Sequence, residues 1–224
     1  MSTPLSRRTR LLRSLASSVI VAVGPAAAQQ ALSSACGDPF RNHFGPFDYR
    51  TAPKETKALV ENHHFTPGIE SMTRPVNTMM HEMAQDVSYT LNVFPNHPRA
   101  LLTMTRLSKK YKSDPPPGTA TTIECWYDRA IRFRPDDTVA RVLYAQYLAK
   151  KSRLAEAIKQ LDSATTFATD NPFSHFNIGL AYFEVQQYDR ALEQAHLAMK
   201  LGFPRQDLAD RLKRVNKWVE PAGG

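Results

Sequence analysis

Apolar residues recur at the spacing of a helix face over most of the chain. Between residues 77 and 94 they stand three or four positions apart, at Met80, Met83, Val87, Leu91 and Phe94. This spacing places them on one side of an α-helix. Pro95 follows, and a proline ends a helix because it lacks an amide donor. The pattern therefore predicts a helix that runs from residue 77 to this proline.

Further along the chain, the pattern of small and apolar residues repeats after 34 positions. The matching pairs are Ala145 and Gly179, Ala157 and Ala191, and Ala164 and Ala198. A constant period of this length, with small residues where helices cross, predicts an all-α solenoid of helix-turn-helix repeats. The first clear repeat begins at Pro98, and the next two span 136–169 and 170–203, with Asp136 and Asp170 as the expected helix N-caps. We therefore expect about three repeats.

The repeats resemble the tetratricopeptide repeat family, in which a small residue is followed by an aromatic residue three positions later, two spaced alanines and a closing proline. The corresponding residues here are Gly179, Tyr182, Ala191 and Ala198, with Pro135 closing the first repeat. Residues 44–50 and 94–101 are similar to an exported form of this family from Gram-negative bacteria. The resemblance to tetratricopeptide repeats implies a concave surface that holds a segment of another protein.

The segments that flank the repeats (residues 96–204) differ from them in composition. Residues 29–76 are expected to form an extended arm, rich in proline, glycine and aromatic residues, and a short helix from Lys54 to about His64. The expected anchors of the arm are Phe44, Phe47 and Tyr49. Residues 77–95 are interpreted as half of a degenerate leading repeat that caps the solenoid.

A second cap is expected after the repeats. Residues 205–220 predict an amphipathic C-terminal capping helix, whose inner face carries Leu208, Leu212, Val215 and Val219. Arg211, Lys213, Arg214 and Lys217 are expected to face solvent on this helix. Residues 221–224 are predicted to be a disordered tail. Within the first repeat, residues 113–118 form an insertion of six residues, which is either a partner contact or a neutral length variation.

The first 28 residues predict a secretory signal peptide, and with it a periplasmic or secreted protein. Four arginines precede a short apolar stretch and a run of small residues that ends at Ala28. The alternative is a retained N-terminal membrane anchor, although the apolar stretch is too short to span a bilayer. The general secretion route is favoured over the twin-arginine route because Arg10 stands where the latter usually has an aromatic residue.

Removal of the signal peptide lowers the formal net charge from +8 to +4. The remaining basic residues are scattered, and this distribution does not favour nucleic acid as a partner. No stable membrane insertion is expected after cleavage. The two cysteines, Cys36 and Cys125, are 89 positions apart and are expected to form a disulfide in an oxidising compartment. The alternative is lipidation of Cys36, because residues 32–36 have some similarity to a lipoprotein cleavage site.

The sequence offers little catalytic chemistry. His81 is followed one turn later by Gln85, where a zinc protease needs a second histidine, and the adjacent His63 and His64 point in different directions on a helix. The chain also lacks a phosphate-binding glycine loop, a nucleophile elbow and a paired-cysteine metal site. We therefore expect no enzyme activity, cofactor or metal, and a histidine-metal enzyme is the least favoured alternative.

The resemblance implies that the first helix of each repeat lines the partner-binding groove, at its second, fifth, ninth and twelfth positions. These are Arg99, Leu102, Arg106 and Lys109, then Val139, Val142, Gln146 and Ala149, then Phe173, Phe176, Leu180 and Phe183. The implied partner is a protein or peptide segment with an acidic part and an apolar anchor, with Phe176 and Phe183 as the anchoring rings. One alternative is that the C-terminal capping helix or the N-terminal arm covers Phe173, Phe176 and Phe183 within the protein itself. Another is a structural subunit whose groove is filled by its own N-terminal arm.

Overall fold

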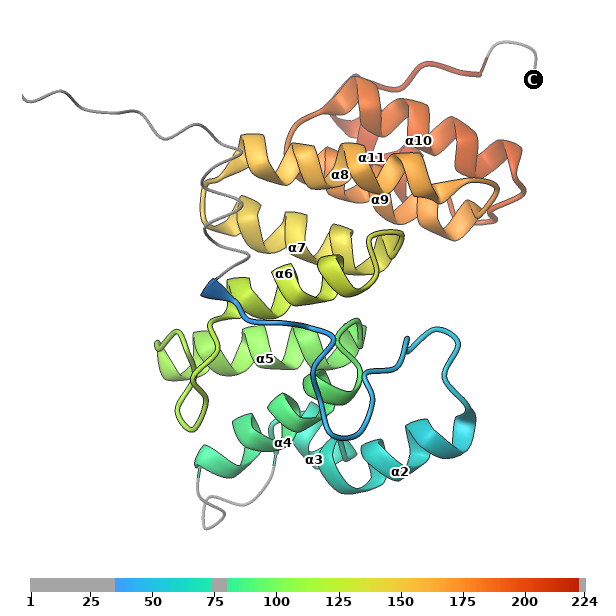
Figure 1. The fold of residues 1–224 in the computed structure, drawn as a ribbon. Helices are drawn as coiled ribbons and strands as arrows, with labels where there is room; N and C mark the ends of the chain where they lie inside the picture. The colour runs from blue at the N-terminus through green and yellow to red at the C-terminus, as the bar shows by residue number, and fades with distance from the viewer. Residues whose placement is uncertain (1–34, 74–79, 222–224) are drawn as a thin grey trace, which may run out of the picture.

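The computed structural model describes residues 35–73 and 80–221, and over these residues it is built of helices with no strand (Figure 1). The predicted signal peptide and the last three residues lie outside the described part of the chain. The helices are α2 (Lys54–His64), α3 (Pro67–Glu70), α4 (Met80–Val93), α5 (Pro98–Tyr111), α6 (Ile123–Phe133), α7 (Thr138–Lys150), α8 (Leu154–Ala168), α9 (Pro172–Glu184), α10 (Tyr188–Lys200) and α11 (Asp207–Arg214). The expected all-α fold is confirmed.

Consecutive helices pack against one another along the chain, as a helical solenoid requires. The pairs α7 and α8, and α9 and α10, form antiparallel hairpins, and the first helices α5, α7 and α9 also contact each other in order (Figure 1). At the start of the array, α4 contacts α5, and both α2 and α3 contact α4. The N-terminal end of the solenoid is therefore covered by three helices rather than by residues 77–95 alone.

Small residues at the helix crossings create the core. Ala145, Ala157 and Ala164 are buried in the second repeat, and Ala191 and Ala198 are buried at the equivalent positions of the third. Helices α9 and α10 approach closely at Gly179, because a Cβ atom at this position would lie 3.1 Å from Cβ of Gln194 on α10. The 34-residue pattern thus marks the positions where two helix backbones come together.

The N-caps lie one residue later than the sequence predicted. The side chain of Asp137 accepts hydrogen bonds from the amides of Val139 and Ala140, and Asn171 caps α9 in the same way. Asp136 is not the cap, and its carboxylate instead pairs with Arg50 at 2.9 Å. The cap is the residue whose backbone is extended, as in Asp137 with ψ of 99°.

The N-terminal arm packs where its aromatic residues were expected to anchor it. Phe44, Phe47 and Tyr49 pack against a buried cluster formed by Val60, Val93 and Phe94. Cys36 and Cys125 lie at disulfide distance, with 2.03 Å between the sulfur atoms and 4.9 Å between the Cα atoms. Because Cys125 belongs to α6, this bond ties the arm to the second helix of the first repeat, as predicted.

A buried amide joins the arm to two repeats. The side chain of Asn96 donates hydrogen bonds to Asp48 of the arm at 2.7 Å and to Asp137 of the next repeat at 2.8 Å. Its oxygen accepts the amide of Tyr49 at 2.9 Å. Asn96 is 2% exposed, so these three bonds satisfy a side chain that would be costly to bury alone.

The C-terminal capping helix is shorter than the predicted range 205–220. It ends at Arg214 because Asn216 adopts a left-handed conformation with φ of 56°. Leu208 and Leu212 are buried as expected, whereas Val215 and Val219 are exposed. The assignment of these two valines to the inner face was therefore wrong, since the chain leaves the helix before it reaches them.

Candidate functional site

A groove of about 230 Å³ lies between the first helices α7 and α9. Its apolar lining comes from Val139, Val142 and Leu143 of α7 and from Phe173 and Leu180 of α9. Five of the predicted groove residues meet here: Val139, Val142, Gln146, Phe173 and Leu180. Phe173 is 54% exposed and Val139 is 39% exposed, so the groove offers apolar surface to a ligand.

Polar contacts bridge α7 and α9 near both ends of the groove. The hydroxyl groups of Thr138 and Ser174 are 3.2 Å apart at the N-terminal ends of the two helices. Toward the C-terminal ends, the amide of Gln146 donates to the carboxylate of Glu184 at 3.3 Å. The apolar side chains therefore lie between two polar contacts.

The groove has one positive group that the sequence did not assign to it. Arg211 of α11 lines the groove, although it was expected to face solvent. Within the described part of the chain Arg211 forms no ion pair. It reaches the groove because α11 folds back and packs against α9 as well as α10. Only the tertiary structure gives this placement, since the 34-residue period ends before α11.

Phe176 is not an exposed anchor, and this part of the prediction was wrong. Its side chain is only 3% exposed, because the ring of Phe203 packs against it at a centroid distance of 4.6 Å and Arg205 lies over its face at 5.1 Å. Gly202, with φ of 83°, turns the chain after α10 and brings Phe203 over α9. The C-terminal segment thus covers Phe176.

The predicted basic end of the groove is partly neutralised within the protein. Arg99 donates to Glu61 at 2.8 Å and to Glu70 at 2.7 Å. Burial alone would raise the pKa of Glu61, but hydrogen bonds from Tyr49 and His97 and the charge of Arg99 outweigh it and lower the pKa. Arg99 therefore joins α5 to α2 and α3, so it is already engaged rather than free to hold a partner.

The remaining predicted residues do not join the groove between α7 and α9. Leu102 and Arg106 are absent from its lining, and Phe183 packs edge-on against Tyr188 of α10 at 5.3 Å. Lys109 lines a separate cavity at the C-terminal ends of α5 and α7. Ala149 is partly buried on α7. The structure therefore divides the single predicted groove into two sites.

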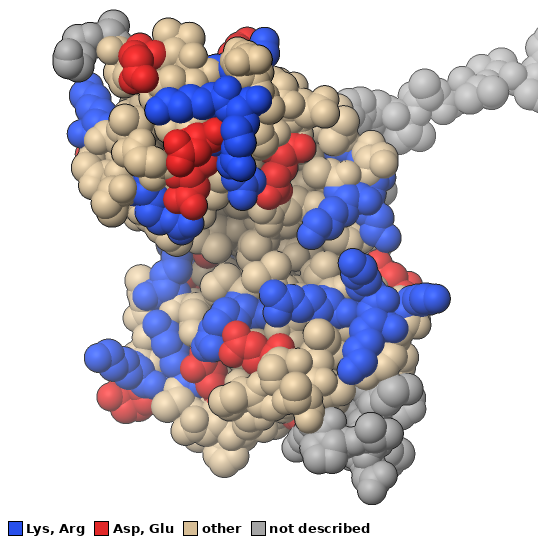
Figure 2. All heavy atoms as spheres, turned by 180° about the vertical axis from the view of Figure 1, so that it is seen from behind, with Lys and Arg blue, Asp and Glu red and all other residues tan. Residues whose placement is uncertain are grey.

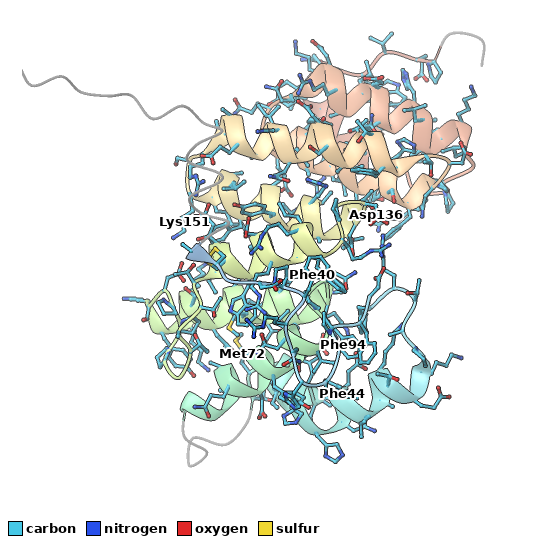
Figure 3. The ribbon with its side chains drawn as sticks, viewed as in Figure 1. Phe40, Phe44, Met72, Phe94, Asp136 and Lys151 are labelled. Atoms are coloured by element: carbon cyan, nitrogen blue, oxygen red, sulfur yellow. A yellow bond between two sulfur atoms is a disulfide. The ribbon has the colours of Figure 1, made fainter. Side chains whose placement is uncertain are left out.

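The described part of the arm does not occupy the groove. Its residues contact α2, α4 and α6: Phe40 packs against Phe133 at 5.5 Å, and Arg132 donates to the carbonyl oxygen of Gly37 at 2.6 Å. Figure 3 shows Phe44 near Phe94 in the lower half of the molecule, below the repeats that form the groove. No arm residue from 35 onward lines the groove.

The histidines of the predicted enzyme alternative are not gathered at one place. His64 is 2.9 Å from Asp86 and packs against Tyr89 in a tilted arrangement, with ring centroids 4.0 Å apart, whereas His63 is exposed. The side chain of His81 lies outside the described residues. Over the residues that the structure describes, no group of three or more histidine, cysteine, aspartate or glutamate side chains is arranged to hold a metal ion.

Comparison with protein-family models and with curated proteins finds no match for the chain. Within residues 35–73 and 80–221, no helix has both the length and the apolar character needed to cross a bilayer. The cysteine pair at disulfide distance is compatible with an extracytoplasmic location.

Proposed function

We propose that the protein is a periplasmic adaptor, similar to tetratricopeptide repeat proteins, that holds a segment of a partner protein in the groove between α7 and α9. The observation that carries this proposal is the exposure of Phe173 and Val139 beside the apolar floor formed by Val142 and Leu180. An exposed apolar patch with a polar rim is typical of a protein interaction surface. Aromatic residues contribute much of the binding energy in such surfaces.

The size and charge of the groove define the kind of partner. A volume of about 230 Å³ suits a small number of side chains from an extended or helical segment rather than a folded domain. An apolar side chain would pack against Val142 and Leu180, and a carboxylate next to it would meet the guanidinium group of Arg211. The segment that fits best has an apolar anchor followed or preceded by an acidic residue.

Two features support the periplasm as the compartment. The first 28 residues have the pattern of a signal peptide, and Cys36 and Cys125 lie at disulfide distance. Disulfides persist in the bacterial periplasm and are rare in the cytosol. A disulfide and a lipid thioether are also alternative uses of the same sulfur atom of Cys36, so the pairing favours the soluble form over the lipidated one.

Site-specific photocrosslinking in the exporting compartment tests the proposal. A photoreactive residue at Asn177, which lines the groove, should give a discrete crosslinked partner, whereas the same residue at the exposed Ala155 of α8 should not. The variant Val139→Glu plus Phe173→Glu should abolish the crosslink, because two carboxylates would enter the apolar surface. A partner that crosslinks equally from both positions, or that is retained by this variant, would refute the groove as the binding surface.

A matched control separates this effect from a general change in surface charge. Leu59 of α2 and Leu154 of α8 are 55% and 49% exposed and lie away from the groove. The variant Leu59→Glu plus Leu154→Glu therefore adds the same charge and removes a similar apolar area. It should keep the crosslink at the wild-type level, and circular dichroism should give the same helix content for all three proteins.

A further inference from the structure

A second cavity, of about 520 Å³, opens at the C-terminal ends of α5 and α7. We call this cavity the basic basin. Lys109 and Lys112 line it from the end of α5, and Lys150 and Lys151 line it from the end of α7. Figure 3 places Lys151 at the edge of the molecule, and Figure 2, seen from behind, shows Lys and Arg side chains gathered along this edge.

The inserted loop of the first repeat forms one wall of the basin. Ser113 and Asp114, at the start of this insertion, line the cavity together with Ser108 and Ile123. The hydroxyl of Ser108 donates to the carbonyl oxygen of Ser113 at 2.7 Å. The carboxylate of Asp114 accepts the amide of Ile123 at 2.8 Å and the hydroxyl of Tyr147 at 3.4 Å. These bonds fix the wall against both α6 and α7.

The described lining of the basin carries an excess of positive charge. Among the described residues, its lining contains four lysines and one carboxylate, that of Asp114, and both oxygens of this carboxylate already accept hydrogen bonds from the protein. No described acidic group forms an ion pair with any of the four lysines. The ammonium group of Lys151 lies 5.7 Å from the ring centroid of Tyr147. Such a cavity attracts anionic groups.

One face of α7 connects the basin to the groove. Val139, Val142, Gln146 and Lys150 follow one another at intervals of three or four residues, so they share this face. Val142 and Gln146 line the groove, and Lys150 lines the basin. Lys150 lies eight positions after Val142, which is a rise of about 12 Å along the helix. About four residues of an extended chain cover this distance.

We propose that the basic basin binds the carboxylates of an acidic stretch in the same partner segment whose apolar anchor occupies the groove. This inference rests on the proposed function. In an extended segment the acidic residues lie about four positions from the apolar anchor, and in a helical segment they lie about eight positions away. The insertion in the first repeat is then a specificity element, because it closes the side of the basin.

The spread of the lysines favours several carboxylates over a single phosphate. Lys109 and Lys112 belong to the end of α5, and Lys150 and Lys151 belong to the end of α7. Lysine is a flexible point charge, and two pairs of lysines on two helix ends suit several carboxylates distributed along a chain.

Selection of random dodecapeptides displayed on phage tests the inference with the mature protein as the bait. The wild type should enrich peptides that combine an apolar residue with Asp or Glu at the stated spacing. The basin variant Lys109→Gln plus Lys150→Gln should still enrich the apolar residue but not the acidic ones. The affinity of a selected acidic peptide for this variant should fall by about tenfold or more, and the remaining salt dependence should be weaker.

A control variant removes the same charge elsewhere. Lys159→Gln plus Lys200→Gln changes two exposed lysines on α8 and α10, outside the basin, and should keep the acidic preference. Equal loss in both variants, or acidic enrichment that survives in the basin variant, would overturn the inference. Displacement of the peptide by inorganic phosphate but not by glutamate, at matched ionic strength, would also overturn it.

The same selection separates the inference from the proposed function. Apolar enrichment without acidic enrichment on the wild type would overturn the basin and leave the groove as a binding site. The groove variant Val139→Glu plus Phe173→Glu should remove the apolar enrichment. A wild-type protein that enriches no class of peptide would overturn both proposals.

Discussion

Gly179 of α9 faces the side chain of Leu208 of α11 so closely that a methyl group on Gly179 would overlap Cδ2 of Leu208. Leu208 is 2% exposed, and it holds the C-terminal helix against the last repeat. The same helix presents Arg211 to the groove. The absence of a side chain at one position of α9 therefore allows the contact that completes one wall of the candidate site.

The variant Gly179→Ala should destabilise the protein. Alanine improves helix propensity by about 1 kcal/mol, but overlap with Leu208 and the approach of Cβ of Gln194 at 3.1 Å should cost more than this. We expect a net loss of about 1 to 2 kcal/mol in the free energy of unfolding. Urea denaturation measures it. The double variant Gly179→Ala plus Leu208→Ala should show a favourable coupling energy, and simple additivity would contradict the overlap.

Replacement of Phe176 should be far more costly than replacement of Phe173. Phe176 is 3% exposed beneath Phe203, whereas Phe173 is 54% exposed. We expect Phe176→Ala to lose about 3 to 5 kcal/mol of unfolding free energy and Phe173→Ala about 0.5 kcal/mol. Thermal and urea denaturation of the two variants provide the comparison. Similar losses would mean that the C-terminal segment does not cover Phe176.

The two neighbouring aspartates before α7 should differ in their effect on stability. Asp137→Ala removes the N-cap of α7 and leaves one donor of the buried Asn96 without a partner. The expected loss in unfolding free energy is about 2 to 4 kcal/mol. Asp136→Ala removes only ion pairs at a carboxylate that is 43% exposed, and it should cost less than about 1 kcal/mol. The reverse order in urea denaturation would place the cap at residue 136.

The protein should lose stability as the pH falls from about 6.5 toward 4, owing to His97. Burial lowers the pKa of His97 to about 4, against the opposing effect of Glu61. The unfolded chain therefore binds a proton in this window that the folded protein excludes. The ring is neutral when folded, since Nδ1 accepts the amide of Ala100 and Nε2 donates to Glu61.

The expected loss in unfolding free energy is about 2 kcal/mol between about pH 7 and pH 5. The variant His97→Asn keeps a capping acceptor but does not titrate, so its stability should change much less over this range. Urea denaturation at several pH values compares the two proteins. An unchanged pH dependence in the variant would show that another group is responsible.

Loss of the bond between Cys36 and Cys125 should destabilise the protein by up to about 4.6 kcal/mol, the chain-entropy value for a loop of this length. The bond joins residues 89 positions apart. The variant Cys36→Ala plus Cys125→Ala should therefore unfold at a lower urea concentration. A reducing agent should shift the wild type to the midpoint of this variant and leave the variant itself unchanged. A reductant-insensitive wild type would mean that the bond is absent.

Local patterns in the sequence predicted the helices because these patterns act over a few residues. The apolar spacing from Met83 to Leu91 fixes the buried face of α4, and the predicted helix from Lys54 to His64 agrees with α2. The 34-residue period located the crossings at Ala157 and Ala191. By contrast, the sequence does not show whether Asp136 or Asp137 is the N-cap of α7. Both residues can cap a helix, and the backbone angle ψ decides which one does.

Local features of the sequence were enough to predict the all-α repeat architecture, the anchoring aromatic residues of the arm and the pairing of the two cysteines. These features follow from periodicity, composition and the chemistry of single residues. The accessibility of residues on the first helices, by contrast, depends on the fold as a whole. Phe176 is covered, Arg99 is paired and Arg211 lines the groove because the segment after Gly202 and the helices before α5 fold back onto the repeats. Such contacts between distant parts of a chain leave no local pattern.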